Sequence, residues 1–225
     1  KLMAPAGGGT FTQPLMPDDI GGFSNFGIDG KLQLEVVDGS LTPVATAAQS
    51  PFTPYSSSFN NYGVPGAKSF HLAAPGYGNP AGIAAGLANP YYARFATSTT
   101  STVIGDAAAQ QPTFFSIWIG NNDVLSYATS GGVGVNQIGN FDGSNDITDP
   151  NVLGNVIDGY AQALTANGAK GVIANIPSVT SVPYFTTVPF APLNPANPDF
   201  GSMIPALNQQ FGALNQVFDA LGASD

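Results

Sequence analysis

Residues 114–123 read FFSIWIGNND, an apolar run that leads directly into a glycine, two asparagines and an aspartate. The run is short, contains aromatic and β-branched side chains, and is bounded by Pro112 and Gly120. These features favour a strand that is buried on both faces, as in a parallel sheet. We therefore predict a buried strand over residues 114–119, with the single tryptophan, Trp118, in the core.

A helix and a second strand follow this run. Residues 151–167 carry apolar side chains on one face at helical spacing, with Thr148 or Asp149 as the cap and Gly168 as the stop. Residues 171–176 read GVIANI, which favours another buried strand. Strand, helix and strand in this order predict a βαβ unit, and therefore a parallel sheet with a right-handed crossover.

The remaining elements are less regular. Residues 1–30 are rich in glycine, proline and aspartate, which predicts irregular structure. Residues 32–37 alternate and end at Asp38-Gly39, a dipeptide suited to the positive φ angles of a hairpin turn. Helices are expected over residues 80–96, where glycine and proline interrupt the pattern, and over residues 202–221.

No charged linker divides the chain, so we expect one α/β domain over residues 1–225. Residues 1–60 would form an irregular and hairpin region, and residues 61–225 the α/β core. At 225 residues and 43% hydrophobic composition, the chain is long enough and apolar enough to bury a sizeable core.

The composition excludes several classes of function. Fourteen acidic side chains against five basic ones give a formal net charge of −9, which opposes binding to nucleic acid or to an anionic membrane surface. Cysteine is absent, so a disulfide framework and a thiolate site are excluded. No apolar run is long enough to span a bilayer. Few lysines and glutamates, with much glycine, asparagine, serine and threonine, favour an extracytoplasmic protein of a bacterium.

Polar residues follow both predicted strands, at the edge of a parallel sheet where ligands bind. Gly120-Asn121-Asn122-Asp123 follows the first strand, and Pro177-Ser178 follows the second. An asparagine amide is a neutral donor at any working pH, which suits the stabilisation of an oxyanion. Alternatively, Asn121 and Asn122 belong to a simple turn whose backbone geometry asparagine tolerates.

Three landmarks in this chain resemble those of the SGNH/GDSL family of ester hydrolases. Residues 120–123 are similar to its Gly-x-Asn-Asp block, and residues 61–67, NYGVPGA, to its Asn-x-Gly-x-x-Gly-Ala block. Residues 175–180 resemble the strand and turn that follow in GDSL lipases. The landmarks cover about residues 60 to 185, and the chain from Gln13 onward resembles secreted or lipoprotein-type members from Bacteroidetes.

The resemblance implies a three-layer, flavodoxin-like α/β fold and hydrolysis of a small ester or an acylated carbohydrate. In the family, the glycine and the asparagine that correspond to Gly66 and Asn122 donate to the oxyanion, from a backbone N–H and a side-chain amide. Gly120 and Asp123 then have structural roles, and Asp123 holds Asn122 in place. No metal or organic cofactor is expected.

Other parts of the family pattern are absent from this sequence. Ser40 lies in the expected hairpin turn, and no Gly-[Asp/Asn]-Ser-[Leu/Ile] block is found. The Asp-x-x-His block that completes the triad is also absent. We therefore expect the chain to be the middle portion of such a hydrolase, without the first strand and the last strand and helix, and inactive by itself.

Two further residues are expected to line an acyl-binding wall. His71 lies between apolar neighbours just past the glycine block, where a role in the pocket or the core is favoured over a role as general base. Tyr184 belongs to the apolar stretch that follows the second predicted strand. Residues 142–149 are rich in oxygen ligands but lack the pattern of an EF-hand, so we interpret them as a solvated loop that feeds the helix cap.

A second function remains open at this point. The chain could be a non-catalytic module that binds carbohydrate or protein on a degenerate hydrolase fold, because its asparagine, tyrosine and aspartate content suits contacts with sugars. A Gly-Asp-Ser-Leu or Gly-Asn-Ser-Leu block encoded upstream, with an Asp-x-x-His block downstream, would favour the enzyme. Their absence would favour the binding module.

Overall fold

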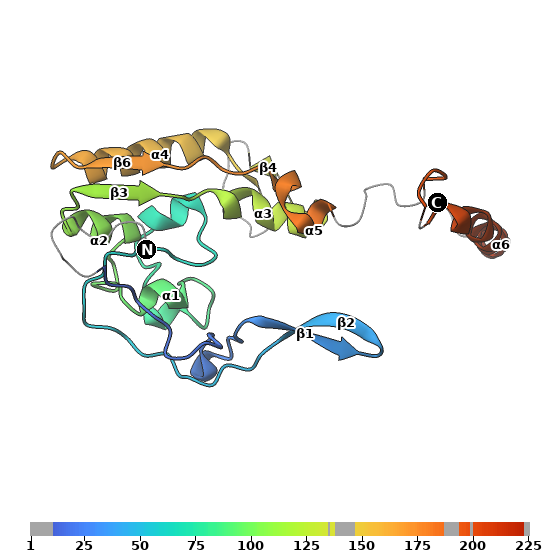
Figure 1. Cartoon of the computed structure of the whole chain (residues 1–225), viewed down its shortest axis with the longest axis horizontal. Helices are drawn as coiled ribbons and strands as arrows, with labels where there is room; N and C mark the ends of the chain where they lie inside the picture. Colours follow the sequence, from blue (N-terminus) through green and yellow to red (C-terminus); the bar gives the residue numbers. More distant parts are fainter. Residues whose placement is uncertain (1–10, 135, 138–146, 187–193, 199, 223–225) are drawn as a thin grey trace. The chain divides into compact units, whose positions relative to one another are not determined.

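The structure, a computed structural model, describes residues 11–134, 136–137, 147–186, 194–198 and 200–222 (Figure 1). The chain forms two compact units, Lys1–Ile176 and Pro177–Asp225. The first unit mixes helices and strands, with a parallel pair of strands and an antiparallel hairpin, which agrees with the α/β class. The prediction of one domain over the whole chain stays a prediction.

The first unit contains, in chain order, η1 (Ser24–Phe26), β1 (Leu32–Val37), β2 (Ser40–Ala45), η2 (Ser69–Ala73), η3 (Pro80–Gly82), α1 (Pro90–Ala93), α2 (Val103–Ala109), β3 (Phe114–Ile117), α3 (Asn121–Thr129), β4 (Asn136–Gln137), β5 (Ile147–Thr148), α4 (Pro150–Thr165) and β6 (Lys170–Ile173). Elements labelled η are 3₁₀ helices. β4 and β5 form a further short parallel pair.

β1 and β2 form the predicted hairpin. Asp38 and Gly39, between the strands, have φ angles of 51° and 80°. Positive φ at both central residues is what a two-residue hairpin turn with the twist of its strands requires. Val37 pairs with Ser40 directly across the turn. The hairpin prediction is therefore confirmed, and the hairpin forms because of the local Asp38-Gly39 turn.

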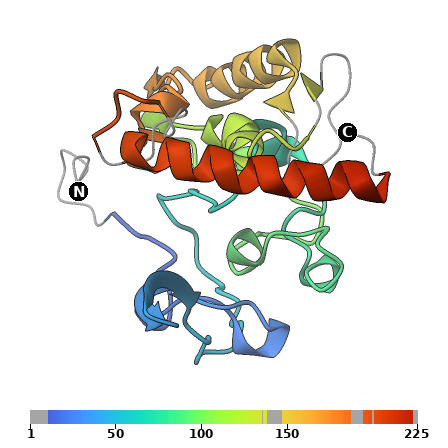
Figure 2. The same ribbon diagram turned by 90° about the vertical axis from the view of Figure 1, so that its right-hand side faces the viewer.

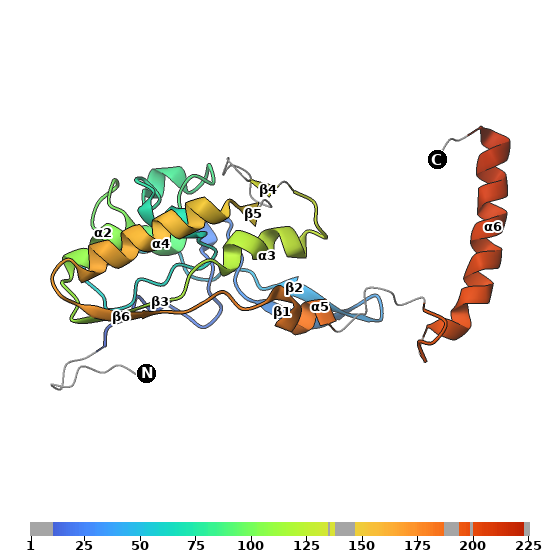
Figure 3. The same ribbon diagram turned by 90° about the horizontal axis from the view of Figure 1, so that it is seen from above.

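β3 and β6 form the parallel pair predicted from the sequence. Phe114 lies opposite Lys170, and Ile117 lies opposite Ile173. α4 comes before β6 in the chain and runs alongside the pair in the view from above (Figure 3). The strand, helix and strand are thus confirmed, with the second strand starting at Lys170 and ending before the predicted residue 176.

Local signals set the ends of α4. The Asp149 carboxylate accepts a hydrogen bond from the N–H of Asn151 at 2.7 Å, which satisfies one of the free donors at the helix start. Pro150 occupies the first turn, where its missing N–H costs nothing. Gly168, with a φ of 83°, follows the end of the helix. The predicted helix over residues 151–167 is confirmed to within two residues at each end.

One face of the β3–β6 pair is covered by helices. Side chains alternate along a strand, so Phe115, Ile117 and Ile119 lie on the same face. Ile117 forms a buried cluster with Tyr160 and Leu164 of α4, and side chains of α2 complete the cluster. This packing defines the core of the α/β part of the unit.

Within the described residues of the first unit, the opposite face of the pair is open. Phe114, Trp118 and Val172 are 44%, 67% and 54% exposed. The prediction that the two strands are buried on both faces is therefore wrong here, as is the placement of Trp118 in the core. The apolar run shows that the strand is of the buried type, but it cannot show which segment covers the second face.

The predicted helix over residues 80–96 is also wrong as a single helix. The segment forms η3, turns and the short α1. Gly86 takes a φ of 71°, which ends the helical path. The Asn89 side chain then accepts from the N–H of Tyr91 at 2.9 Å and starts α1 afresh. α1 supplies Tyr92, which is fully buried in a second cluster with Phe59, Phe95 and Val103.

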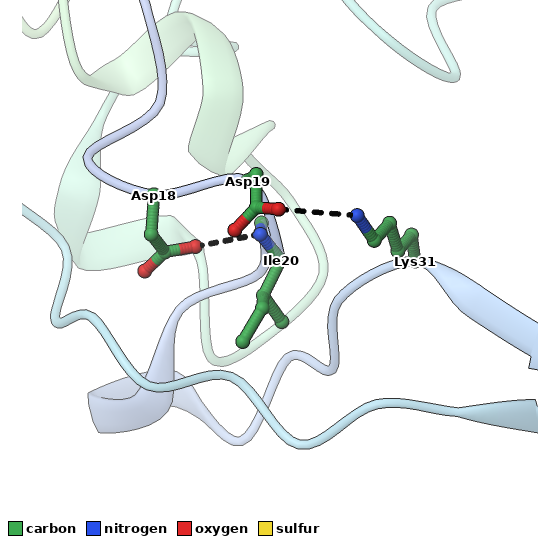
Figure 4. Close-up of polar contacts among 5 residues, drawn as sticks. Asp18, Asp19, Ile20 and Lys31 are labelled. Carbon is green, nitrogen blue, oxygen red and sulfur yellow. Dashed lines mark hydrogen bonds and ion pairs between the residues drawn. The ribbon is translucent and has the colours of Figure 1, made fainter.

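Of the segment 1–30 that was predicted to be irregular, the structure describes residues 11–30, and these are irregular apart from η1. Its turns are held by side chains: Asp18 accepts from the N–H of Ile20 at 2.9 Å, and Lys31 lies 3.7 Å from Asp19 (Figure 4). A hydrogen bond from the Ser50 hydroxyl holds the pKa of Asp18 below its usual value. These contacts fix a segment that has little regular structure of its own.

The second unit contains η4 (Val179–Ser181), α5 (Pro183–Thr186), η5 (Gly201–Met203) and α6 (Ile204–Leu221). α6 is the long red helix in Figure 2. It confirms the helix predicted over residues 202–221, and Gly222, with a φ of 69°, ends it. Among the described residues, no helix combines the length and apolar character needed to cross a bilayer.

Candidate functional site

The turn after β3 is shaped by Gly120. This residue has a φ of 107° and precedes α3, which begins at Asn121. A Cβ atom at position 120 would lie 2.5 Å from Cδ1 of Ile176. The backbone angle therefore favours glycine, and an added Cβ would also displace the end of the Ile176 side chain. The turn places Asn122 and Asp123 in the first turn of a helix, at the carboxyl end of a parallel strand.

Asp123 joins this turn to the segment after the glycine block. Its carboxylate accepts from the N–H of Ser69 at 2.8 Å and from the Ser69 hydroxyl at 2.6 Å. Asp123 is 2% exposed and Ser69 is fully buried. The helix N-terminus also favours the negative charge. Two segments that are 54 residues apart in the sequence are thus fixed to each other.

α4 contributes a third bond to the same point. The Tyr160 hydroxyl donates to the carbonyl oxygen of Ser69 at 2.7 Å. Burial raises the pKa of Tyr160 to about 12, so the hydroxyl stays protonated and remains a donor over the whole physiological range. Ser69 is therefore held through its N–H, its hydroxyl and its carbonyl.

The side chain of Asn122 reaches the glycine block. Its Nδ2 donates to the carbonyl oxygen of Ala67 at 2.9 Å, which uses one of the two N–H bonds of the amide. Gly66, the residue before Ala67, has a φ of 75°. Among the residues that the structure describes, the N–H of Gly66 donates to no acceptor. Asn122 and Gly66, predicted separately, are thus brought to neighbouring positions with one N–H each to spare.

His71 lies in η2, next to this site. Its Nδ1 accepts from the N–H of Lys68 at 3.1 Å, and its ring stacks on Tyr77 with centroids 4.7 Å apart. Burial lowers the pKa of His71, and the positive charge of Lys68 lowers it further, while Asp123 acts in the opposite direction. The imidazole is therefore mainly neutral at neutral pH, with its proton on Nε2 because Nδ1 is an acceptor.

Comparisons with known proteins identify no relative of this chain. No protein family, curated protein or solved structure matches the chain.

The structure leaves several predicted residues apart from this site. Ser40 begins β2 in the hairpin. Tyr184 lies in α5 of the second unit, and its side chain falls outside the described residues. The oxygen-rich loop at 142–149 also lies outside them up to residue 146, whereas Asp149 caps α4 as expected. In the described part of the chain, no three acidic or histidine side chains gather as a metal site would require.

Sequence reasoning missed Ser69 and Tyr160. A serine and a tyrosine carry no local pattern that distinguishes a buried clamp from an ordinary position. Their partners lie 54 and 91 residues away in the sequence, so only the folded chain brings them together. The sequence left Asn121 open between an amide donor and a turn residue, and in the structure its Oδ1 is buried with no hydrogen-bond partner in the described part of the chain.

Proposed function

We propose that this chain carries the oxyanion-binding part of a serine ester hydrolase of the SGNH type. The observation that carries this proposal is the hydrogen bond from Asn122 to Ala67, which sets the asparagine amide beside Gly66. The remaining N–H of the amide and the free N–H of Gly66 are two neutral donors. Such donors stabilise the negative charge that develops on a carbonyl oxygen during acyl transfer.

Rigidity around the two donors supports this role. Donors are effective when they are held in place before the reaction, so that little reorganisation is needed. Asp123 and Tyr160 hold Ser69, and Ser69 follows Ala67 by two residues. The Asn89 amide also donates to the carbonyl oxygen of Pro65 at 2.9 Å, just before Gly66. The glycine block is thus fixed on both sides.

The nucleophile, its base and the acid that orients the base would come from parts of the protein other than this chain. His71 is the only histidine in the sequence, and its ring contacts the rings of Tyr77 and Phe70. In the complete enzyme, we propose a flavodoxin-like sheet built outward from β3 and β6. The parallel pairing of these strands and their single covered face support that extension. We propose a small ester or an acylated carbohydrate as substrate, and an extracytoplasmic location.

The test uses the protein extended at both ends by the sequence that its gene encodes there. In that protein, Asn122→Ala should lower kcat by roughly 10²–10³-fold, the usual loss for one oxyanion donor. Asn121→Ala is the matched control, because it removes the neighbouring amide, and it should change kcat by less than about threefold. A change within twofold for Asn122→Ala would remove this residue from the mechanism.

The chain as it stands provides a second test. It should show no hydrolysis of a short-chain nitrophenyl ester above background, because no serine is activated by a histidine. Saturable hydrolysis that is lost in Ser40→Ala would place the nucleophile in the hairpin and overturn the proposed division of the site.

A further inference from the structure

Arg94 is a buried cation surrounded by neutral groups. Arg94 is the residue directly after α1, and it is 3% exposed. Nη1 donates to the sulfur of Met16 at 2.9 Å and to the carbonyl of Pro14 at 3.4 Å, and Nη2 donates to the carbonyl of Leu15. The guanidinium also lies 4.9 Å from the centre of the Tyr55 ring. These contacts fix the N-terminal segment, but none of them carries a negative charge.

The positive charge is uncompensated in the described part of the chain. No carboxylate there lies within ion-pair distance of Arg94, and the ion pair that is found, Lys31 with Asp19, is on the surface (Figure 4). A guanidinium has five N–H donors, of which three are used here. Burying a charge without a counter-charge is costly, so an anion at the two free donors would be stabilised.

A small cavity adjoins this cation. Its volume is about 180 Å³, and the residues that line it include Arg94, Leu15, Pro65 and Phe95. Gln13 and Asn61, whose side-chain amides are hydrogen-bonded to each other, also line it. Pockets for drug-sized ligands are larger, about 300–1,000 Å³, so this cavity suits a ligand of only a few heavy atoms.

We propose that the cavity binds a short-chain organic carboxylate. The carboxylate accepts from the free N–H groups of Arg94, since a planar guanidinium matches the geometry of a carboxylate. The hydrocarbon part lies against Leu15 and Phe95. Pro65, in the wall of the cavity, directly precedes Gly66, so the ligand lies beside the candidate oxyanion site. Binding needs only the cation and the apolar walls, and can be measured whether or not the chain hydrolyses esters.

The experiment is a titration of the chain with butyrate, followed by the backbone amide signals of the non-proline residues in 13–16 and 61–66 in NMR spectra. Saturable shifts with a Kd in the millimolar range are expected for so small a ligand. Butyramide, which has the same shape without the charge, should bind at least about tenfold more weakly. Equal binding of the two, or no saturation up to about 100 mM butyrate, would overturn the proposal.

Inorganic phosphate distinguishes a carboxylate site from a general anion site. It should bind more weakly than butyrate, because it has no hydrocarbon part to fill the apolar end of the cavity. Phosphate binding as tight as that of butyrate would overturn the assignment of a carboxylate.

Two leucines offer a matched pair of variants. Leu15→Trp enlarges a residue that lines the cavity, whereas Leu32→Trp makes the same change on the hairpin, and both leucines are 67% exposed. Leu15→Trp should weaken butyrate binding at least about tenfold, and Leu32→Trp should leave it within twofold. Arg94→Lys keeps the charge but loses the planar guanidinium whose paired donors match a carboxylate, and is expected to weaken binding as well. If Arg94→Lys does not fold, the leucine pair still decides, and unchanged binding in Leu15→Trp would overturn the proposal.

Discussion

Ser69 shows how single polar residues hold this molecule together. It is fully buried, and its N–H, hydroxyl and carbonyl are each paired, with Asp123 and Tyr160. A buried polar network of this kind stabilises only while all its members are satisfied. Each bond in it is therefore sensitive to the loss of one partner.

Ser69→Ala should lower the free energy of unfolding by about 1–3 kcal/mol, because it leaves one oxygen of the buried Asp123 carboxylate without its donor. Chemical denaturation followed by circular dichroism measures the change. Ser57→Ala is the control, since Ser57 is exposed, and should change stability by less than about 0.5 kcal/mol. Equal effects of the two substitutions would show that the hydrogen bond from Ser69 to Asp123 does not stabilise the fold.

His71 makes stability depend on pH. Its pKa in the folded chain lies below the usual value of 6.5, mainly because of burial. The unfolded chain therefore binds the proton first, so the contribution of His71 is present above pH 6.5 and is lost as the pH falls through the lower, folded pKa. Because the sequence has one histidine, no other imidazole contributes to the loss of stability below pH 6.5.

The measurement is a pair of denaturation curves, one at about pH 7.5 and one at about pH 5.5, for the chain and for His71→Gln. The difference in stability between the two pH values should be smaller in the variant. An NMR titration of the imidazole should also give a pKa below 6.5. A pKa at or above that value would show that the ring is not desolvated as the structure indicates.

Among elements, the turn from β3 to α3 is the one on which the candidate site depends. Gly120 connects them at a φ of 107°, and a Cβ at this position would meet the end of the Ile176 side chain. The position of Asn122 at the start of α3 follows directly from this turn.

Gly120→Ala should therefore destabilise the chain by about 1–3 kcal/mol, through backbone strain and overlap with Ile176. Gly159→Ala, inside α4, is the control, because an added Cβ there meets nothing within 4 Å. It should be neutral or stabilising, by up to about 1 kcal/mol, since alanine favours a helix. Thermal unfolding of both variants measures the contrast, and a stable Gly120→Ala protein would show that the turn adapts.

The elements also show which predictions a sequence allows. α4 and the hairpin follow from signals within a few residues: a cap, a proline, an Asp-Gly turn. The open face of β3 could not be predicted, because an apolar strand does not reveal what covers it. For the site, Asn122 and Gly66 were found through a resemblance to family motifs, and the fold brings them together. Arg94 and Ser69 escaped notice because the segments they bind lie about 80 and 54 residues away.

At the scale of the whole molecule, this acidic chain exposes apolar side chains at several places, among them Leu32, Leu34 and Val36 of the hairpin. The net charge of the chain is −9. Yet the face of β3 and β6 away from the helices exposes Phe114, Trp118 and Val172. Exposed apolar side chains that adjoin one another are unusual for a surface in water.

Trp118 reports on this face directly, because it is the only tryptophan in the sequence and is 67% exposed. In the chain by itself, its fluorescence should resemble that of an indole in water, should be quenched readily by acrylamide, and should shift little on unfolding in urea. In the protein extended by its flanking sequence, a second helix layer of the proposed flavodoxin-like fold would cover this face, so the emission should move to shorter wavelength and quenching should fall. A blue-shifted, protected tryptophan in the chain alone would contradict the open face. An exposed tryptophan in the extended protein would instead argue against the proposed layer on that side of the sheet, because a second layer of helices buries the side chains beneath it.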